Sequence, residues 1–327
     1  MTHSSAQQSK REQLPSEQQR ALKKAVIWQI ITIAYTTVTI TVVAFVLGNS
    51  QAMKTAWIED MLSLIPQLAF LVSLLFVQRK PTTKHPYGWH RVMGIGHLVA
   101  GVALLAVGLI LAFESALGLL AAEHPTIGTV VLFGDTVWMG WLMVAIMAAI
   151  IVGPLIYGPA KARLAPVLHN KLLYADADMA KADWQTNAAS IVGVLGVGLG
   201  IWWLDGAAAI FIAIGIIVDG LRNTSGAIQD LMDQSARRYD GKVEHPLIQE
   251  LLVFLLEKDW IDDAAVRMRD QGQVFHVEVF VRPVSQHASL DALGALATEI
   301  TEIDWKLHDV VVVPTSVLPT YAESLTR

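Results

Sequence analysis

Long apolar stretches constrain this chain more than any other feature of its sequence. A helix of about 20 apolar residues is enough to cross the hydrocarbon core of a bilayer. Hydrophobic residues make up 54% of the chain and charged residues only 16%, which is more apolar surface than one soluble core can bury. The sequence therefore predicts a polytopic membrane protein with six transmembrane helices, near residues 25–48, 55–78, 91–120, 134–158, 174–203 and 206–232.

The end of the chain has a different character. Residues 234–327 contain 9 Lys and Arg against 15 Asp and Glu, so we expect a soluble domain with no surface for nucleic acid. Its periodicity predicts an α-β-β-α-β order, typical of a ferredoxin-like α+β domain, with helices at 244–257 and 289–302 and strands at 264–269, 273–282 and 310–314. We divide the chain into an N-terminal arm (1–24), a transmembrane domain (25–233) and this soluble domain (234–327).

The basic residues between the spans indicate an orientation. They gather in the N-terminal arm and in the second and fourth connections, as Lys10, Arg11, Arg20, Lys23, Lys24, Arg79, Lys80, Lys84, Arg91, Lys161, Arg163 and Lys171. On the opposite side we find only Lys54. The positive-inside rule then predicts that both termini are cytoplasmic, and we expect a prokaryotic inner membrane.

Acidic residues inside two spans are candidates for function, because Asp at the centre of a membrane helix costs roughly 2.5–3.5 kcal/mol. In the second span, Asp60, Ser63 and Gln67 share one face, and Glu59 points about 100° away. In the fifth, Asp176, Met179, Asp183 and Asn187 share a face, and Asp178 lies about 140° from Asp183. Carboxylate, amide and hydroxyl oxygens from two helices suit a divalent metal ion.

Four motifs in this order resemble the cation diffusion facilitator family: HPYGWHR at 85–91, ADW at 182–184, WWLDGAAA at 202–209 and DLMD at 230–233. The resemblance covers nearly the whole chain. It implies a six-helix homodimer with a cytoplasmic ferredoxin-like domain. Such a protein exports a divalent metal ion from the cytoplasm in exchange for protons, through a site between the second and fifth helices. It implies no enzyme activity and no prosthetic group.

The resemblance also implies ligands, with departures. Asp183 matches the last ligand of the fifth helix, and Met179 stands where relatives place His or Asp. In the second helix the acidic pair is adjacent, and the second ligand position falls on Ser63 or Leu64. Either Asp60, Glu59, Asp176 or Asp178 substitutes from a neighbouring position, or the site uses Met179 and Ser63. Zinc is the usual substrate of the family, whereas a carboxylate-rich site without histidine suggests iron or manganese.

The loop motif gives two further expectations from the resemblance. His85 matches the first histidine of a loop metal site, but Trp89 stands at the second position and His90 follows it, so a loop site of His85 and His90 is possible. Arg91 and Asp233 match a charge pair that interlocks two protomers.

Two other classes of function compete. An intramembrane metal-dependent enzyme would need an open metal position with a general base nearby. We find no HExxH motif, no GxSxG motif and no paired nucleophile in the sequence. A non-transporting scaffold or a metal-sensing protein of the same fold is the alternative reading, and the carboxylate at Asp183 argues against it.

Overall fold

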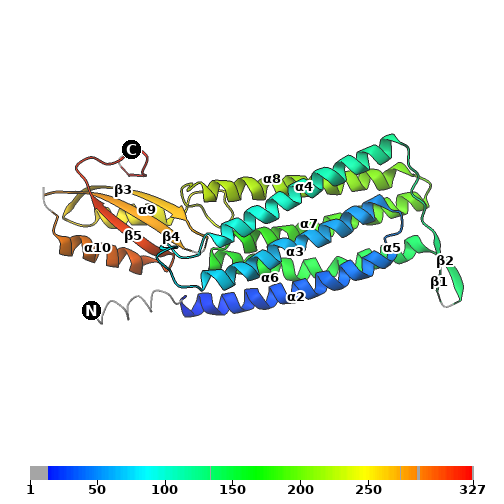
Figure 1. Ribbon diagram of the computed structural model, residues 1–327, viewed down its shortest axis with the longest axis horizontal. Coiled ribbons are helices and arrows are strands. Elements are labelled where there is room, and N and C mark those ends of the chain that lie inside the picture. The colour runs from blue at the N-terminus through cyan, green and yellow to red at the C-terminus, as the bar shows by residue number, and fades with distance from the viewer. Residues whose placement is uncertain (1–13, 133, 273, 286–287, 326–327) are drawn as a thin grey trace.

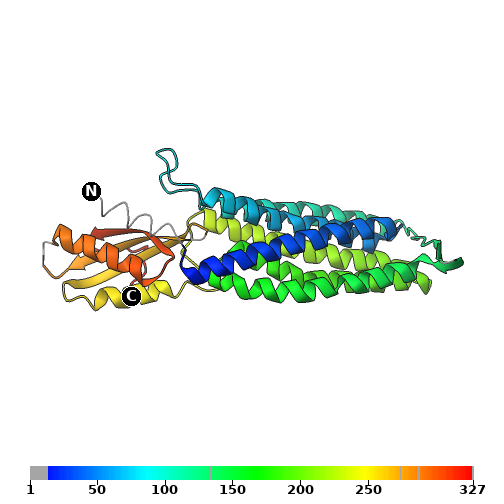
Figure 2. The same ribbon diagram turned by 90° about the horizontal axis from the view of Figure 1, so that it is seen from below.

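The computed structural model describes residues 14–325 except 133, 273, 286 and 287, so most of the predicted N-terminal arm lies outside it. A long helical bundle occupies one end of the molecule and a small α+β domain the other (Figures 1 and 2). The helices of the bundle are α2 (Ser16–Val46), α3 (Gln51–Val77), α4 (Val92–Leu120), α5 (Met139–Ile150), α6 (Val152–Leu168), α7 (Lys171–Gly198) and α8 (Trp203–Leu231). We call the end of the bundle next to the α+β domain the proximal end and the other the distal end.

Side-chain caps fix where two bundle helices begin. The Ser50 hydroxyl accepts a hydrogen bond from the backbone N–H of Met53 at the start of α3. The Asn170 side chain does the same for Leu173 at the start of α7. Both residues satisfy backbone donors that have no partner inside the helix. The preceding residue, His169, ends α6 in the left-handed conformation with φ of 43°, so the chain turns sharply from α6 into α7.

The membrane domain follows the apolar pattern of the sequence. Within the described residues, five helical segments are long and apolar enough to span a membrane, and one of them joins α5 and α6 over Met139–Leu168. Helix α7 has a similar length, but Asp176, Asp178 and Asp183 lower the hydropathy of its first half. The helical membrane domain is confirmed, and the count of six spans stays a prediction.

The fourth predicted helix was misplaced. A short hairpin of β1 (Thr129–Leu132) and β2 (Asp135–Trp138) occupies its expected start, and α6 continues ten residues beyond its expected end. Lys161 and Arg163 therefore lie in a helix and not in a loop, which removes them from the orientation argument. Helix α6 contains prolines at 159 and 166, and a membrane helix tolerates proline where neighbouring groups satisfy the freed carbonyls.

Helices α4 and α8 approach each other most closely through glycine. A Cβ atom at Gly101 would lie 2.6 Å from the backbone nitrogen of Thr224, and one at Gly220 would lie 2.5 Å from that of Leu105. Only residues without a side chain allow two backbones to come this near, a common basis of helix association in membranes.

The C-terminal domain confirms the predicted order of elements. It contains α9 (Leu247–Leu256), β3 (Ile261–Asp270), β4 (Phe275–Pro283), α10 (Leu290–Ile303) and β5 (Leu307–Pro314). Strand β4 is central, antiparallel to β3 and parallel to β5. The two helices bury Leu251, Leu255, Leu296 and Ile300 against the sheet. A parallel pair needs a crossover connection, and α10 provides it.

Candidate functional site

Three acidic side chains lie within electrostatic range of one another inside the bundle, where α3 packs against α7. Glu59 and Asp60 lie on α3 and Asp183 lies on α7. Glu59 and Asp183 are 7% and 8% exposed, and Asp60 is half-buried. Both carboxyl groups of α3 are close enough to Asp183 to interact with it electrostatically. Like charges gathered in a low-dielectric interior repel one another, so this arrangement favours a bound cation or proton.

Glu59 faces α7, although its position on the helix predicted that it would point away. Its carboxylate accepts a hydrogen bond from Thr186, one turn after Asp183. Its second oxygen, Oε2, is buried and has no hydrogen-bond partner among the residues that the structure describes. Buried polar atoms without a partner are rare in folded proteins, and each calls for a ligand or water.

Side chains with neutral oxygen atoms lie on the same two helices as the three carboxylates. The Ser63 hydroxyl donates to the backbone oxygen of Asp60 at 2.8 Å, which leaves its lone pairs available. Gln67 is 3% exposed, and its Oε1 has no partner in the described part of the chain. On α7, Asn187 donates to the backbone oxygen of Asp183 at 2.7 Å. The site therefore combines carboxylate, hydroxyl and amide oxygens, the donor set of hard divalent cations.

Met179 lies on α7 one turn before Asp183. It is buried in an apolar cluster with Leu62 of α3, Leu104 of α4 and Ile212 of α8. Methionine commonly fills irregular gaps in such clusters, so this environment is the one expected of a packing residue. Its side chain also lines the cavity described below.

Asp176 is held by two partners outside the carboxylate group. Its Oδ2 atom accepts hydrogen bonds from Lys161 of α6 at 2.7 Å and from Gln29 of α2 at 2.8 Å. Asp178 forms an ion pair of 3.3 Å with Arg222 of α8. The structure thus brings Asp183 together with Glu59 and Asp60, and directs Asp176 and Asp178 toward different neighbours.

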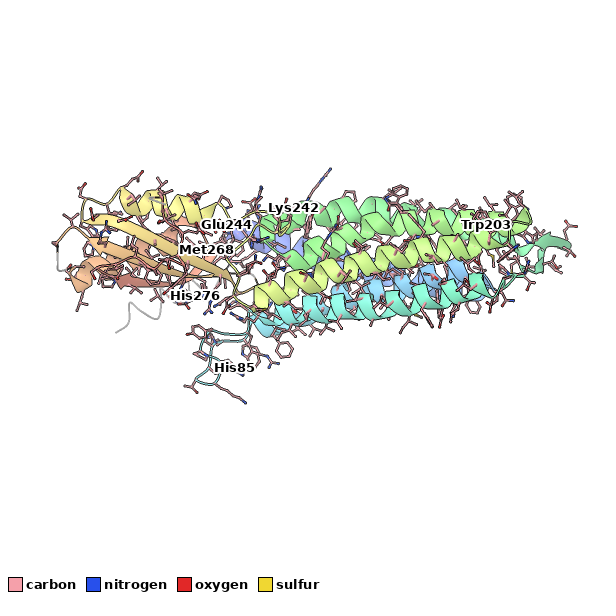
Figure 3. The ribbon with its side chains drawn as sticks, turned by 90° about the horizontal axis from the view of Figure 1, so that it is seen from above. His85, Trp203, Lys242, Glu244, Met268 and His276 are labelled. Carbon is pink, nitrogen blue, oxygen red and sulfur yellow. The ribbon has the colours of Figure 1, made fainter. Side chains whose placement is uncertain are left out.

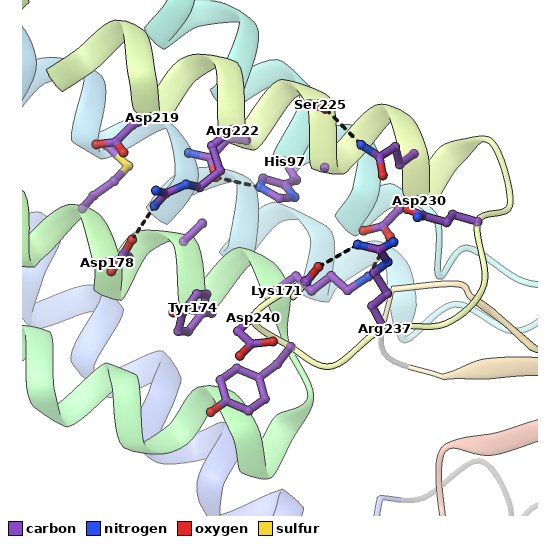
Figure 4. Close-up of a pocket in the computed structure, with 18 residues that line it drawn as sticks. His97, Lys171, Tyr174, Asp178, Asp219, Arg222, Ser225, Asp230, Arg237 and Asp240 are labelled. Carbon is purple, nitrogen blue, oxygen red and sulfur yellow. Dashed lines mark hydrogen bonds and ion pairs between the residues drawn. The ribbon is translucent and has the colours of Figure 1, made fainter. Parts of the chain in front are cut away.

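A cavity of about 300 Å³ opens between α7 and α8 at the proximal end of the bundle (Figure 4). Asp178, Asp219 and Asp230 line it, together with Arg222 and Lys171. His97 of α4 also lines it and hydrogen-bonds to Asn223 at 3.1 Å. Its walls are of mixed charge, because Arg222 pairs with Asp178 and Lys171 pairs with Asp230.

Asp219 was missed by sequence reasoning. This carboxyl group lies on α8 and interacts electrostatically with both Glu59 and Asp183, so it connects the cavity with the carboxylate group. The available signal was an acidic residue inside the last apolar stretch, IGIIVDGL. Tyr157 of α6 was also missed, and its hydroxyl donates to Asp183 Oδ2 at 3.3 Å.

The two loop histidines point to different neighbours. The His85 ring packs on Trp89 at 3.9 Å between centroids, on a loop that projects from the bundle (Figure 3). The His90 ring faces His308 of β5 at 5.6 Å. Burial lowers the pKa of His90 to about 4, and the charge of His308 acts in the same direction. Within the described residues, no three His, Asp or Glu side chains are close enough to hold one metal ion between them. This holds for the loop and also for Glu59, Asp60 and Asp183, which interact electrostatically but do not form a closed coordination shell in this structure.

Arg91 and Asp233 form an ion pair within one chain. Asp233 follows α8 and also contacts Arg269 of β3 at 2.8 Å, so it links the bundle to the soluble domain. Burial opposes ionisation of Asp233, but the hydrogen bond and charge of Arg91, with the charge of Arg269, lower its pKa. The two side chains pair within one chain, and the interlock between protomers stays a prediction.

Comparisons with known proteins identify the family of the membrane domain. Residues 27–232 match the model of the cation efflux transmembrane domain. The chain is 25% identical over 297 residues to the Uncharacterized transporter YdbO of Bacillus subtilis (strain 168), and the aligned region covers 86% of this chain and 91% of that protein. It is 24% identical over 259 residues to the Manganese efflux system protein MneS of the same organism, and this aligned region covers 78% of this chain and 81% of that protein.

Proposed function

The chain belongs to the cation efflux family, and from this premise we propose that it exports a divalent metal ion, manganese or ferrous iron in preference to zinc, in exchange for protons. Membership of this family identifies the chain as a membrane transporter of metal cations. One observation carries the proposal beyond that. Glu59 and Asp60 both interact electrostatically with Asp183 inside the bundle, and a buried oxygen of Glu59 has no partner among the described residues.

Proton exchange follows from the chemistry of these groups. A carboxylate must release its proton before it can bind a metal ion, so metal and proton compete for the same oxygens. Three carboxyl groups in one buried place cannot all stay ionised without a cation. The metal displaces protons when the site is open to one side, and protons displace the metal when it is open to the other.

The preference for manganese or iron rests on the donor set. The carboxylate oxygens of Glu59, Asp60 and Asp183 are accompanied by hydroxyl and amide oxygens on the same two helices. No histidine lies among the polar residues of α3 or α7. Zinc sites generally include nitrogen or sulfur ligands, whereas oxygen ligands suit manganese. The manganese efflux relative supports the same choice.

Orientation and assembly are parts of the proposal. Arg79, Lys80 and Lys84 lie in the connection between α3 and α4, at the end of the bundle that carries the soluble domain, which supports a cytoplasmic location for that end. The chain contains no cysteine, so single cysteines introduced at Ser316 and Glu123 would report the sidedness of each end by labelling intact cells. We further propose a homodimer, with the Arg91–Asp233 pair near its interface, which mass determination in detergent would test.

Proteoliposomes loaded with a pH-sensitive dye test the exchange. Addition of Mn2+ or Fe2+ to vesicles containing the protein should drive protons across the membrane, and Zn2+ should drive a smaller flux. Empty vesicles provide the control for leakage of each metal. Metal uptake without a pH change would contradict proton exchange. Binding of metal without any uptake would favour the alternative, a metal-sensing protein of the same fold.

A further inference from the structure

Lys161 is a charged residue in the interior of the bundle. It lies on α6, is 0% exposed and makes an ion pair of 2.7 Å with Asp176 of α7, which is itself buried. Burying two ions removes them from water, and the attraction between them often fails to offset that cost. An apolar pair would hold two helices together at lower cost, so this pair calls for an explanation other than stability.

Packing between α6 and α7 does not depend on the ion pair. One turn before Lys161, Gly158 lies against Ala180 of α7, where an added Cβ atom would be 3.2 Å from the Ala180 Cβ atom. Apolar residues of α6 and α7, including Leu168, Leu172 and Leu173, share a buried cluster. The helices therefore have an apolar interface of their own.

The ion pair lies beside the transport site. The Lys161 ammonium is 5.2 Å from the centre of the Tyr157 ring, and the Tyr157 hydroxyl donates to Asp183. Asp183 interacts electrostatically with both members of the pair, and Asp176 and Lys161 act on it with opposite signs. Gln29 of α2 donates to Asp176 and fixes the carboxylate in place.

We propose that Lys161 and Asp176 are positioning residues of the transport reaction, a compensated charge pair that sets the affinity of the site at Asp183 for a divalent cation. The inference rests on the proposed function. Each charge alone would strongly shift the binding of a doubly charged ion, because Coulomb interactions in a water-poor interior are weakly screened. Together the two charges oppose each other at Asp183, so each limits the effect of the other on metal binding and release.

Three variants separate this role from a structural one: Asp176→Asn, Lys161→Met, and the double variant. KM and kcat for Mn2+ would be measured in proteoliposomes. Asp176→Asn leaves Lys161 uncompensated and should raise KM about tenfold. Lys161→Met should not raise KM. The double variant removes both charges and should return KM to within about threefold of the wild-type value.

Lys54→Met is the matched control. Lys54 also pairs with a carboxylate of a neighbouring bundle helix, Glu114, but its side chain is 51% exposed. Its charge is screened by solvent, so KM should change by less than about twofold.

The outcomes are distinct. A double variant as impaired as Asp176→Asn, or single variants that lower only kcat and the amount of folded protein, would overturn the inference while leaving the exporter intact. A wild-type protein that moves no divalent metal would overturn the proposed function and this inference with it.

Discussion

Asp205, at the start of α8, accepts a hydrogen bond of 2.6 Å from the hydroxyl of Ser50, the residue that caps α3. The same carboxylate accepts hydrogen bonds from the backbone N–H groups of Gln51 at 2.6 Å and Ala52 at 3.4 Å. It is 0% exposed. One buried side chain of α8 thus satisfies the first backbone donors of α3, the helix that carries Glu59 and Asp60. Its negative charge lies at the N-terminus of α3, where the helix dipole stabilises an anion.

We predict that Asp205→Ala destabilises the membrane domain by about 1–3 kcal/mol, because buried backbone donors lose their acceptor. Thermal unfolding in detergent would measure the loss. Asp205→Asn keeps one acceptor oxygen and should lose less. A variant as stable as the wild type would show that water replaces the carboxylate.

Asp183→Ala should abolish metal transport, with a loss of at least about 100-fold, because it removes the carboxylate that interacts electrostatically with both acidic residues of α3. Metal uptake in proteoliposomes, with expression and oligomeric state as controls, is the measurement. Asp178→Asn is a useful comparison, since Asp178 pairs with Arg222 and not with the α3 carboxylates, and it should retain more activity. Normal transport by well-folded Asp183→Ala protein would remove Asp183 from the site.

Sequence position favours Asp60 over Glu59 as the ligand of α3, whereas the structure places both beside Asp183. We therefore expect that Asp60→Asn and Glu59→Gln each reduce transport by about tenfold or more. Gln at position 59 can still accept the hydrogen bond from Thr186, so a loss would reflect charge and not packing. Wild-type rates for either variant would assign the site to the other residue alone.

Met179→His tests selectivity. Imidazole is a good ligand for zinc, whereas a thioether is a soft, neutral donor. If Met179 lines the site, the substitution should raise zinc transport relative to manganese. If Met179 only fills its apolar cluster, all metals should fall together, and Met179→Leu should retain most activity because its volume is similar. Competition between Mn2+ and Zn2+ in the same vesicles gives the ratio directly. A wild-type protein that moves zinc and ignores manganese and iron would contradict the ligand set.

His245 makes the junction between the two domains sensitive to acid. Its ring packs 4.9 Å from those of His169 and Phe275. Burial lowers the pKa of His245 to about 3, and the charges of Lys306 and His169 act in the same direction. The unfolded chain, with a His pKa of about 6.5, takes up the proton first as the pH falls. The contribution of His245 to stability is therefore lost progressively from about pH 6.5 down to about 3.

Thermal unfolding between pH 5 and 8 would test this dependence. His245→Phe keeps an aromatic ring at the junction and removes the titrating group, so it should flatten the fall in melting temperature below about pH 6.5. His124→Phe, an exposed position at the distal end, should leave the slope unchanged. An unchanged slope in His245→Phe would assign the acid sensitivity to other groups.

Hydropathy and periodicity alone determined the membrane domain and the order of elements in the soluble domain. Both properties belong to consecutive residues, and burial in lipid or against a sheet imposes them directly on the sequence. The acidic residue at position 183 was identifiable for a similar reason, because a carboxylate followed by a long apolar stretch is rarely without a function.

The tertiary structure decided which charges meet. Lys161, which was expected in the connection after a helix ending at residue 158, is buried opposite Asp176, and Gln29 reaches the same carboxylate from 147 positions away in the chain. Glu59 turns toward Thr186. Asp219 joins the group from the last helix. Such contacts depend on how helices pack and rotate against one another, and no local pattern in the sequence encodes the partner of a buried charge.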